Sequence, residues 1–186
     1  MIYSEYQKSR DAAWEILLHE QICELPIRVI TLCRQIGIEV QYDDTLPGGV
    51  DGKASMIGGA PIILLNPLAA ANRKKFTVAH ELGHILLGHV GQYGPVHRGH
   101  AFSGNSKEQA ANVFASRLLA PACVLWGCNV QTEQDIMQLC GISREAAHYR
   151  MERMRELYRR NKFLVSPLER EVYRQFLPFI TAYRNG

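Results

Sequence analysis

The chain has 186 residues, of which 47% are hydrophobic and 21% are charged, and its net charge is +3 at pH 7. This composition is typical of a globular protein that buries one core, so we expect a single domain over residues 1–186 and neither a disordered nor a fibrous chain. The longest apolar stretch, residues 60–71, is shorter than the roughly 20 residues that a membrane-spanning helix needs, and the N-terminus lacks the pattern of a secretory signal. We therefore expect a cytoplasmic protein without membrane contacts.

The first part of the chain predicts two helices and then a small sheet. Apolar residues recur at helical spacing over residues 4–35, with a second run opening at Pro26 and ending at Gly37. Three short segments are expected to be strands: residues 38–42, 53–57 and 61–65. The last two flank Gly58-Gly59, as the strands of a hairpin would.

The rest of the chain predicts mainly helices. A helix is expected to begin at Asn66-Pro67, with Asn66 as its cap, and to run to about His89. The glycine-rich residues 91–104 are predicted to form a loop that borders or covers a site. Further helices are expected at residues 106–119, 132–140 and 143–160, and the last segment as one more helix or tail.

These elements predict an α+β fold that is mostly helical. The small sheet is expected to pack on a buried helix, within a catalytic core over residues 38–121. Residues 132–186 are expected to form a helical segment that begins like a helix-turn-helix. The five cysteines are odd in number and form no C-x-x-C pair, so they indicate reduced, buried thiols rather than disulfides or a structural zinc site.

The strongest functional signal is an H-E-x-x-H motif, which begins at His80 and ends at His84. Residues four apart lie one turn apart on the same face of a helix, so both imidazoles can reach one metal ion, for which zinc is the first candidate. Glu81 lies about 100° further round the helix, where it can contact a metal-bound water rather than the metal. The motif therefore predicts a metal site with Glu81 as the general base.

The residues around the motif are apolar and strengthen this interpretation against a chance match. They cover nearly all of the remaining helix surface: Phe76, Val78, Ala79, Leu82, Ile85, Leu86 and Leu87. If two imidazoles and a carboxylate were buried on this helix without partners, the folded state would be destabilised by several kcal/mol. A metal ion with its water would satisfy all three.

A catalytic zinc also needs a third protein ligand. His89 is disfavoured, because five residues beyond His84 it would point roughly 140° away on a continuous helix. Val90 stands where the extended motif with a third histidine requires His, so that subclass is excluded. His97 and His100 lie in the predicted loop and stay open as alternatives or as substrate contacts.

Glu108 is the preferred third ligand. It lies on one side of the next predicted helix together with Asn112, one turn later, and with small residues that permit close helix packing. Glu108 can then reach the metal, while Asn112 can accept a hydrogen bond from a ligand imidazole. The alternative is that Glu108 only interacts with the helix dipole in the first turn.

Three segments resemble the ImmA/IrrE family of small metallopeptidases: residues 76–89, 108–115 and 118–121. The resemblance extends over about residues 50–121, and Ala120 departs from it, since the family usually has Met there. It implies a zinc-dependent, gluzincin-like endopeptidase with Glu108 as the third ligand, and manganese stays open as the metal. It also implies a protein substrate, namely a transcriptional repressor of a phage or mobile element, or a stress-response regulator.

Other roles are open at this point. Tyr93, His97 and His100 are candidates for contacts to the substrate or the transition state. From Ser143 onward the chain has ten Lys or Arg and five Glu, so a DNA-binding helix-turn-helix is one alternative, although an apolar stripe favours packing on the core. Another alternative is a regulator that binds a repressor without cutting it.

Overall fold

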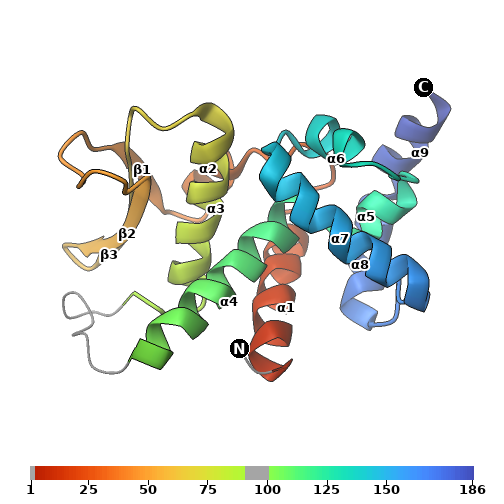
Figure 1. Ribbon diagram of the computed structural model, residues 1–186, viewed down its shortest axis with the longest axis horizontal. Helices are drawn as coiled ribbons and strands as arrows, with labels where there is room; N and C mark the ends of the chain where they lie inside the picture. Colours follow the sequence, from red (N-terminus) through yellow and green to blue (C-terminus); the bar gives the residue numbers. More distant parts are fainter. Residues whose placement is uncertain (1–2, 91–100) are drawn as a thin grey trace. The chain divides into compact units, whose positions relative to one another are not determined.

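The computed structural model describes residues 3–90 and 101–186 and is mostly helical, with one three-stranded sheet, which confirms the predicted α+β class (Figure 1). The chain divides into two compact units. The first comprises Met1–Ala12 and Arg28–Ala115, and the second comprises Ala13–Ile27 and Ser116–Gly186. The single domain over residues 1–186, with its core at residues 38–121, stays a prediction.

The first unit contains the sheet and the motif helix. Its elements in chain order are α2 (Val29–Gln35), β1 (Glu39–Tyr42), β2 (Gly52–Ile57), β3 (Ala60–Leu65) and α3 (Ala71–Leu86). Two longer helices contribute residues to both units: α1 (Tyr3–His19) and α4 (Ala101–Leu119). The strand order is β1-β3-β2, with β1 parallel and β2 antiparallel to β3. The three predicted strands are confirmed to within one residue.

The motif helix α3 packs against β2 and β3 (Figure 1). Its side chains Val78, Ala79 and Leu82 are fully buried, whereas Leu86 is 40% exposed. Burial is thus concentrated on the face toward the sheet and α4, and it decreases toward the C-terminal end of the helix. This one-sided burial packs α3 on the sheet while its polar side chains remain partly accessible.

Helix α3 begins later than the sequence predicts. Its cap is Ala70, and the Oδ1 atom of Asn66 instead accepts a hydrogen bond from the backbone N–H of Leu68 at 2.9 Å. Asn66 therefore forms a local turn between β3 and α3, as asparagine often does. The prediction of Asn66 as the helix cap was wrong. An asparagine side chain can accept a backbone N–H either at the start of a helix or in a local turn, and here it does so in the turn.

The second unit is helical in its described part. Besides the shares of α1 and α4, it contains α5 (Ala122–Gly127), α6 (Glu133–Cys140), α7 (Arg144–Arg160), α8 (Pro167–Gln175) and α9 (Leu177–Asn185). Thr132 caps α6 in a capping box with Asp135, Gly141 follows the helix in the left-handed conformation, and Ser143 caps α7. The predicted helix, turn and helix are confirmed. Helix α5 and the division of the last segment into α8 and α9 were not predicted.

One stretch of the described chain, Ser106–Gly127, is long and apolar enough to cross a membrane by length and composition alone. The sequence prediction overlooked it, because the stretch spans the end of α4 and the whole of α5. Of its apolar window, 78% is buried inside the structure, as in the core helix of a globular protein. The absence of membrane contacts and the cytoplasmic location stay predictions.

Four of the five cysteines are buried, as predicted, and Cys23 is exposed. Burial raises the pKa of the Cys33 thiol to about 12, so this thiol stays protonated at neutral pH. The prediction of buried thiols was therefore wrong only for Cys23, which follows α1.

Candidate metal centre

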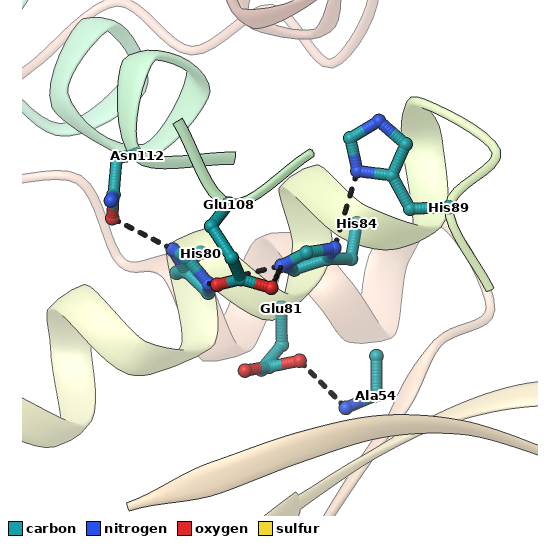
Figure 2. Close-up of polar contacts among 7 residues, drawn as sticks. All are labelled: Ala54, His80, Glu81, His84, His89, Glu108 and Asn112. Carbon is teal, nitrogen blue, oxygen red and sulfur yellow. Dashed lines mark hydrogen bonds and ion pairs between the residues drawn. The ribbon is translucent and has the colours of Figure 1, made fainter. Parts of the chain in front are cut away.

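The two motif histidines and Glu108 meet at one point between α3 and α4 (Figure 2). The Nε2 atoms of His80 and His84 are 3.0 Å apart. One carboxylate oxygen of Glu108 lies 3.1 Å from Nε2 of His80, and the other lies 3.3 Å from Nε2 of His84. The structure therefore brings together the three side chains that were predicted as metal ligands.

A glycine of the motif permits the close approach of the two helices. A Cβ atom at Gly83 would lie 3.0 Å from Cδ1 of Phe114, which is fully buried on α4. This separation is shorter than ordinary van der Waals contact, so a larger residue would push α4 away from α3. The glycine within H-E-x-x-H thus permits α4, which carries Glu108, to lie close to the helix of the histidines.

His80 is oriented by a second residue of α4. Its Nδ1 atom lies 2.9 Å from Oδ1 of Asn112. Because an amide oxygen only accepts hydrogen bonds, Nδ1 carries the ring proton, and Nε2 presents its lone pair toward His84 and Glu108. Asn112 lies where the sequence placed a support for a ligand imidazole.

The surroundings of His84 favour the neutral form of its ring. Burial lowers its pKa, the charge of His80 lowers it further, and the carboxylates of Glu108 and Glu81 raise it. The net shift is downward, so His84 is neutral at neutral pH, which is the form that has a lone pair for a metal. Its side chain is 13% exposed, and that of His80 is 15% exposed.

Glu81 lies on another side of α3 and points toward the sheet (Figure 2). Its Oε2 atom accepts a hydrogen bond of 2.7 Å from the backbone N–H of Ala54 in β2. Glu81 is therefore not among the three converging side chains, in agreement with the geometry expected from its place on the helix. The contact with Ala54 holds its carboxylate beside the edge of β2.

The donor set fits a zinc-sized cation. Tetrahedral ligands placed about 2.0–2.1 Å from zinc are separated from one another by roughly 3.3 Å. The corresponding separations here are 3.0, 3.1 and 3.3 Å. Moreover, two Nε2 atoms that face each other can share only one proton, whereas a cation attracts both lone pairs and the carboxylate.

His89 also touches the cluster, although the sequence predicted that it points away. Its Nδ1 atom lies 3.2 Å from Nδ1 of His84. Burial, followed by the charges of His84 and Lys107, lowers the pKa of His89 to about 4. The prediction of its direction was wrong because it assumed a helix that continues to residue 89, whereas α3 ends at Leu86.

The three loop residues proposed as contacts, Tyr93, His97 and His100, lie outside the described residues. The hydrogen bond from Ala54 to Glu81 was not predicted. Its donor is a backbone N–H, which every residue type except proline has, so the amino-acid type at position 54 gives no signal for it. The only sequence signal for it is that a strand precedes the motif helix.

Comparison with known proteins places this arrangement in a family. The family model Peptidase_M78, described as the IrrE N-terminal-like domain, matches residues 33–152. The chain belongs to this peptidase family. The matched range includes the sheet, α3 and α4, and thus every described residue of the candidate centre. The resemblance to ImmA/IrrE metallopeptidases is confirmed.

The fold is also found in a solved structure. A Mycobacterium tuberculosis transcriptional regulator matches with a TM-score of 0.53 and 19% sequence identity, over 78% of this chain and 48% of that chain. This chain therefore spans about half the length of that protein, and the likeness shows the fold alone. No curated protein matches the chain.

Proposed function

We propose that this IrrE-like peptidase domain is a metal-dependent endopeptidase that cleaves a transcriptional repressor or a stress-response regulator. His80, His84 and Glu108 hold zinc, and Glu81 is the general base. The observation that carries the proposal is the convergence of the Nε2 atoms of His80 and His84 with the carboxylate of Glu108. Glu81, which follows His80 on the same helix, supplies a second carboxylate nearby. Membership of a peptidase family supports the reaction class.

Zinc is the metal that this donor set favours. Two imidazole nitrogens and one carboxylate are common ligands of catalytic zinc, whereas manganese prefers sites richer in oxygen and binds more weakly at nitrogen. When bound, the metal would polarise the scissile carbonyl and lower the pKa of a coordinated water. Manganese is the alternative that the same three residues can also bind.

Glu81 is held in place for proton transfer. The hydrogen bond from Ala54 fixes its Oε2 atom at 2.7 Å, so the carboxylate has one preferred orientation. We assign to Oε1 the transfer of a proton from the attacking water to the nitrogen of the leaving amine. A residue in this role contributes a factor of about 10²–10⁴ in rate.

The neighbouring strand suits an extended peptide substrate. Within the described ranges β2 is an edge strand, with β3 on one side. The N–H of Ala54 points away from β3, since it donates to Glu81. In an antiparallel pair the N–H and C=O of one residue face the same side, so the C=O of Ala54 and the backbone groups of Met56 also face outward, beside the N–H that donates to Glu81. A substrate strand that pairs there would run past Glu81.

The substrate is assigned from the resemblance rather than from the site. ImmA/IrrE metallopeptidases act on repressors, and the solved structure of similar fold is called a transcriptional regulator. A narrow substrate range also agrees with the site, because an edge strand binds extended segments and folded proteins seldom expose them.

DNA binding by α6 and α7 is the weaker alternative. Ala147, Met151 and Met154 of α7 are buried, so one face of the helix serves packing. Arg150 is also buried, and Arg159 and Arg160 both pair with Glu156. Salt-sensitive DNA binding that survives substitution of Glu81 would favour this alternative.

The test is cleavage by the zinc-loaded protein and by Glu81→Gln, with a mixed library of unfolded polypeptides as substrate and mass spectrometry to identify internal cuts. We expect cuts with the wild type and none with Glu81→Gln, although both bind zinc. Equal cutting by both proteins would contradict the role of Glu81. A regulator that acts by binding alone would make no cuts, and Glu81→Gln would then still control its repressor.

A further inference from the structure

The end of α3 has a hydrogen-bond pattern that folds the chain back on the helix. Gly88 has φ +71°, the N–H of His89 donates to the carbonyl of His84 at 2.8 Å, and that of Gly88 donates to the carbonyl of Ile85 at 3.1 Å. These two bonds form a Schellman motif, in which glycine supplies the left-handed residue. The residue after the glycine is thereby brought beside the residue five positions earlier.

In a Schellman motif these two residues usually make a hydrophobic contact. Here they are His89 and His84, whose ring centroids lie 5.1 Å apart with an interplanar angle of 69°. Their Nδ1 atoms are 3.2 Å apart, which is hydrogen-bond distance. A helix-ending motif has therefore placed a polar ring, instead of an apolar side chain, against one of the two motif histidines.

The position of the protons follows from the other nitrogen of His84. Its Nε2 atom faces Nε2 of His80 and the carboxylate of Glu108. For Nε2 to offer a lone pair to a metal, the ring proton of His84 must lie on Nδ1. Nδ1 of His89 is then the acceptor, and the proton of His89 lies on its own Nε2.

Each motif histidine thus has an acceptor at its Nδ1 atom. For His80 the acceptor is Oδ1 of Asn112, at 2.9 Å. For His84 it is Nδ1 of His89, at 3.2 Å. Figure 2 shows Asn112 and His89 at opposite ends of the cluster, each beside one imidazole.

We propose that His89 is a positioning residue, which accepts the Nδ1 proton of His84 and so holds its ring in the tautomer and orientation that bind metal. The inference rests on the proposed function in that His80, His84 and Glu108 are taken to hold the ion. It assigns no contact between His89 and the metal. Partners of this kind typically change metal affinity by about 10–100-fold when they are replaced.

Two substitutions separate the hydrogen bond from packing. His89→Asn places Oδ1 at the position of Nδ1 along the side chain, so it keeps an acceptor. His89→Leu removes the acceptor but supplies the apolar side chain that Schellman motifs commonly have at this position. His19→Ala serves as the matched control, because the side chain of His19 is 82% exposed and its ring pairs with Glu20 rather than with the cluster.

The experiment measures the zinc dissociation constant of the full chain by competition with a chelating dye, together with the unfolding temperature of each metal-free protein. We expect His89→Leu to bind zinc about 10–100-fold more weakly, while His89→Asn and His19→Ala stay close to the wild type. The metal-free unfolding temperatures of all four proteins should agree.

Three results would overturn the inference. Zinc binding by His89→Leu as tight as that of the wild type would remove His89 from the metal site and leave the proposed function intact. Equal weakening in His89→Leu and His89→Asn, with lowered unfolding temperatures, would show a structural role only. A wild type that binds no zinc would overturn the proposed function and this inference together.

Discussion

Two clusters of histidine and glutamate stand out among the described residues, and one of them has the geometry of a metal site. In the first unit, His80, His84 and Glu108 direct their ligand atoms to one point. In the second unit, His148 lies between two glutamates: its Nδ1 is 2.7 Å from Glu133 and its Nε2 is 3.8 Å from Glu152. The residue types are the same, but the two ring nitrogens of His148 face different carboxylates on opposite sides.

Spacing along the helix does not explain this difference. His148 and Glu152 are four residues apart, as are His80 and His84. What differs is the neighbouring helix, which brings a carboxylate to the same side as both Nε2 atoms in the first cluster. The side chain of His148 is also 49% exposed, whereas those of His80 and His84 are mostly buried. Convergence and partial burial, rather than composition, thus distinguish the candidate metal centre.

The largest expected effect is the loss of cleavage in Glu81→Gln, a variant that should still bind metal at the first cluster. Glu81→Gln keeps the shape of the side chain but removes the base, so the cleavage rate should fall by about 10²–10⁴-fold. Zinc content should not change, because Glu81 contacts Ala54 and not the three converging side chains. The measurement is peptide cleavage together with metal analysis of the same samples. Loss of zinc from this variant would place Glu81 among the ligands.

The next largest effect is expected on zinc binding when Glu108 of the first cluster is replaced, with Glu133 of the second cluster as its control. Glu108→Ala should weaken zinc binding by more than the roughly 100-fold that the loss of a supporting residue causes, since a ligand is removed. Glu133→Ala is the matched control and should leave zinc binding unchanged. Calorimetric or dye-competition titration of both variants checks this prediction. Similar affinities would mean that Glu108 is not a ligand.

A smaller effect is expected at the support of His80. Asn112→Leu removes the acceptor at 2.9 Å from Nδ1 and should weaken zinc binding by about 10–100-fold. Asn112→Asp retains an acceptor and should bind zinc more tightly than Asn112→Leu. The same titration decides the point, and equal affinities of the two variants would argue against a hydrogen bond to His80.

Close packing of α3 on α4 can be tested through Gly83. Gly83→Val should lower the free energy of unfolding by about 1–3 kcal/mol, because the added atoms meet Phe114. In a double-mutant cycle with Phe114→Ala, part of that loss should be recovered, since the smaller side chain makes room. Additive effects, measured by denaturant unfolding, would show that the two residues do not restrict each other.

The smallest effect is expected in the second cluster. His148→Ala should change the free energy of unfolding by only about 0–1 kcal/mol, as is usual for exposed ion pairs, and should leave zinc binding unchanged. Chemical unfolding and metal analysis of this variant therefore provide the baseline for the substitutions above.

Most of the fold and of the candidate site could be predicted from the sequence, and the parts that could not be predicted depend on where a helix begins or ends. The strands were predicted because β-rich runs end at clear turns, and Glu108 and Asn112 because their spacing places them on one helix face. The position of His89 was not predicted. Gly88 adopts a left-handed conformation just after the end of α3, which turns His89 back toward His84. Helix α5 was not predicted, because it begins directly after Pro121, two residues beyond the end of α4, and proline is compatible with the end of one helix as well as with the start of the next.

The geometry of the two clusters predicts a metal ion at the first cluster and none at the second. Elemental mass spectrometry of the purified wild type, of the double variant His80→Ala and His84→Ala, and of His148→Ala tests it most directly. We expect about one metal ion per chain in the wild type and in His148→Ala, and none in the double variant. A wild type without metal after zinc or manganese has been supplied, or a double variant that retains it, would contradict the claim.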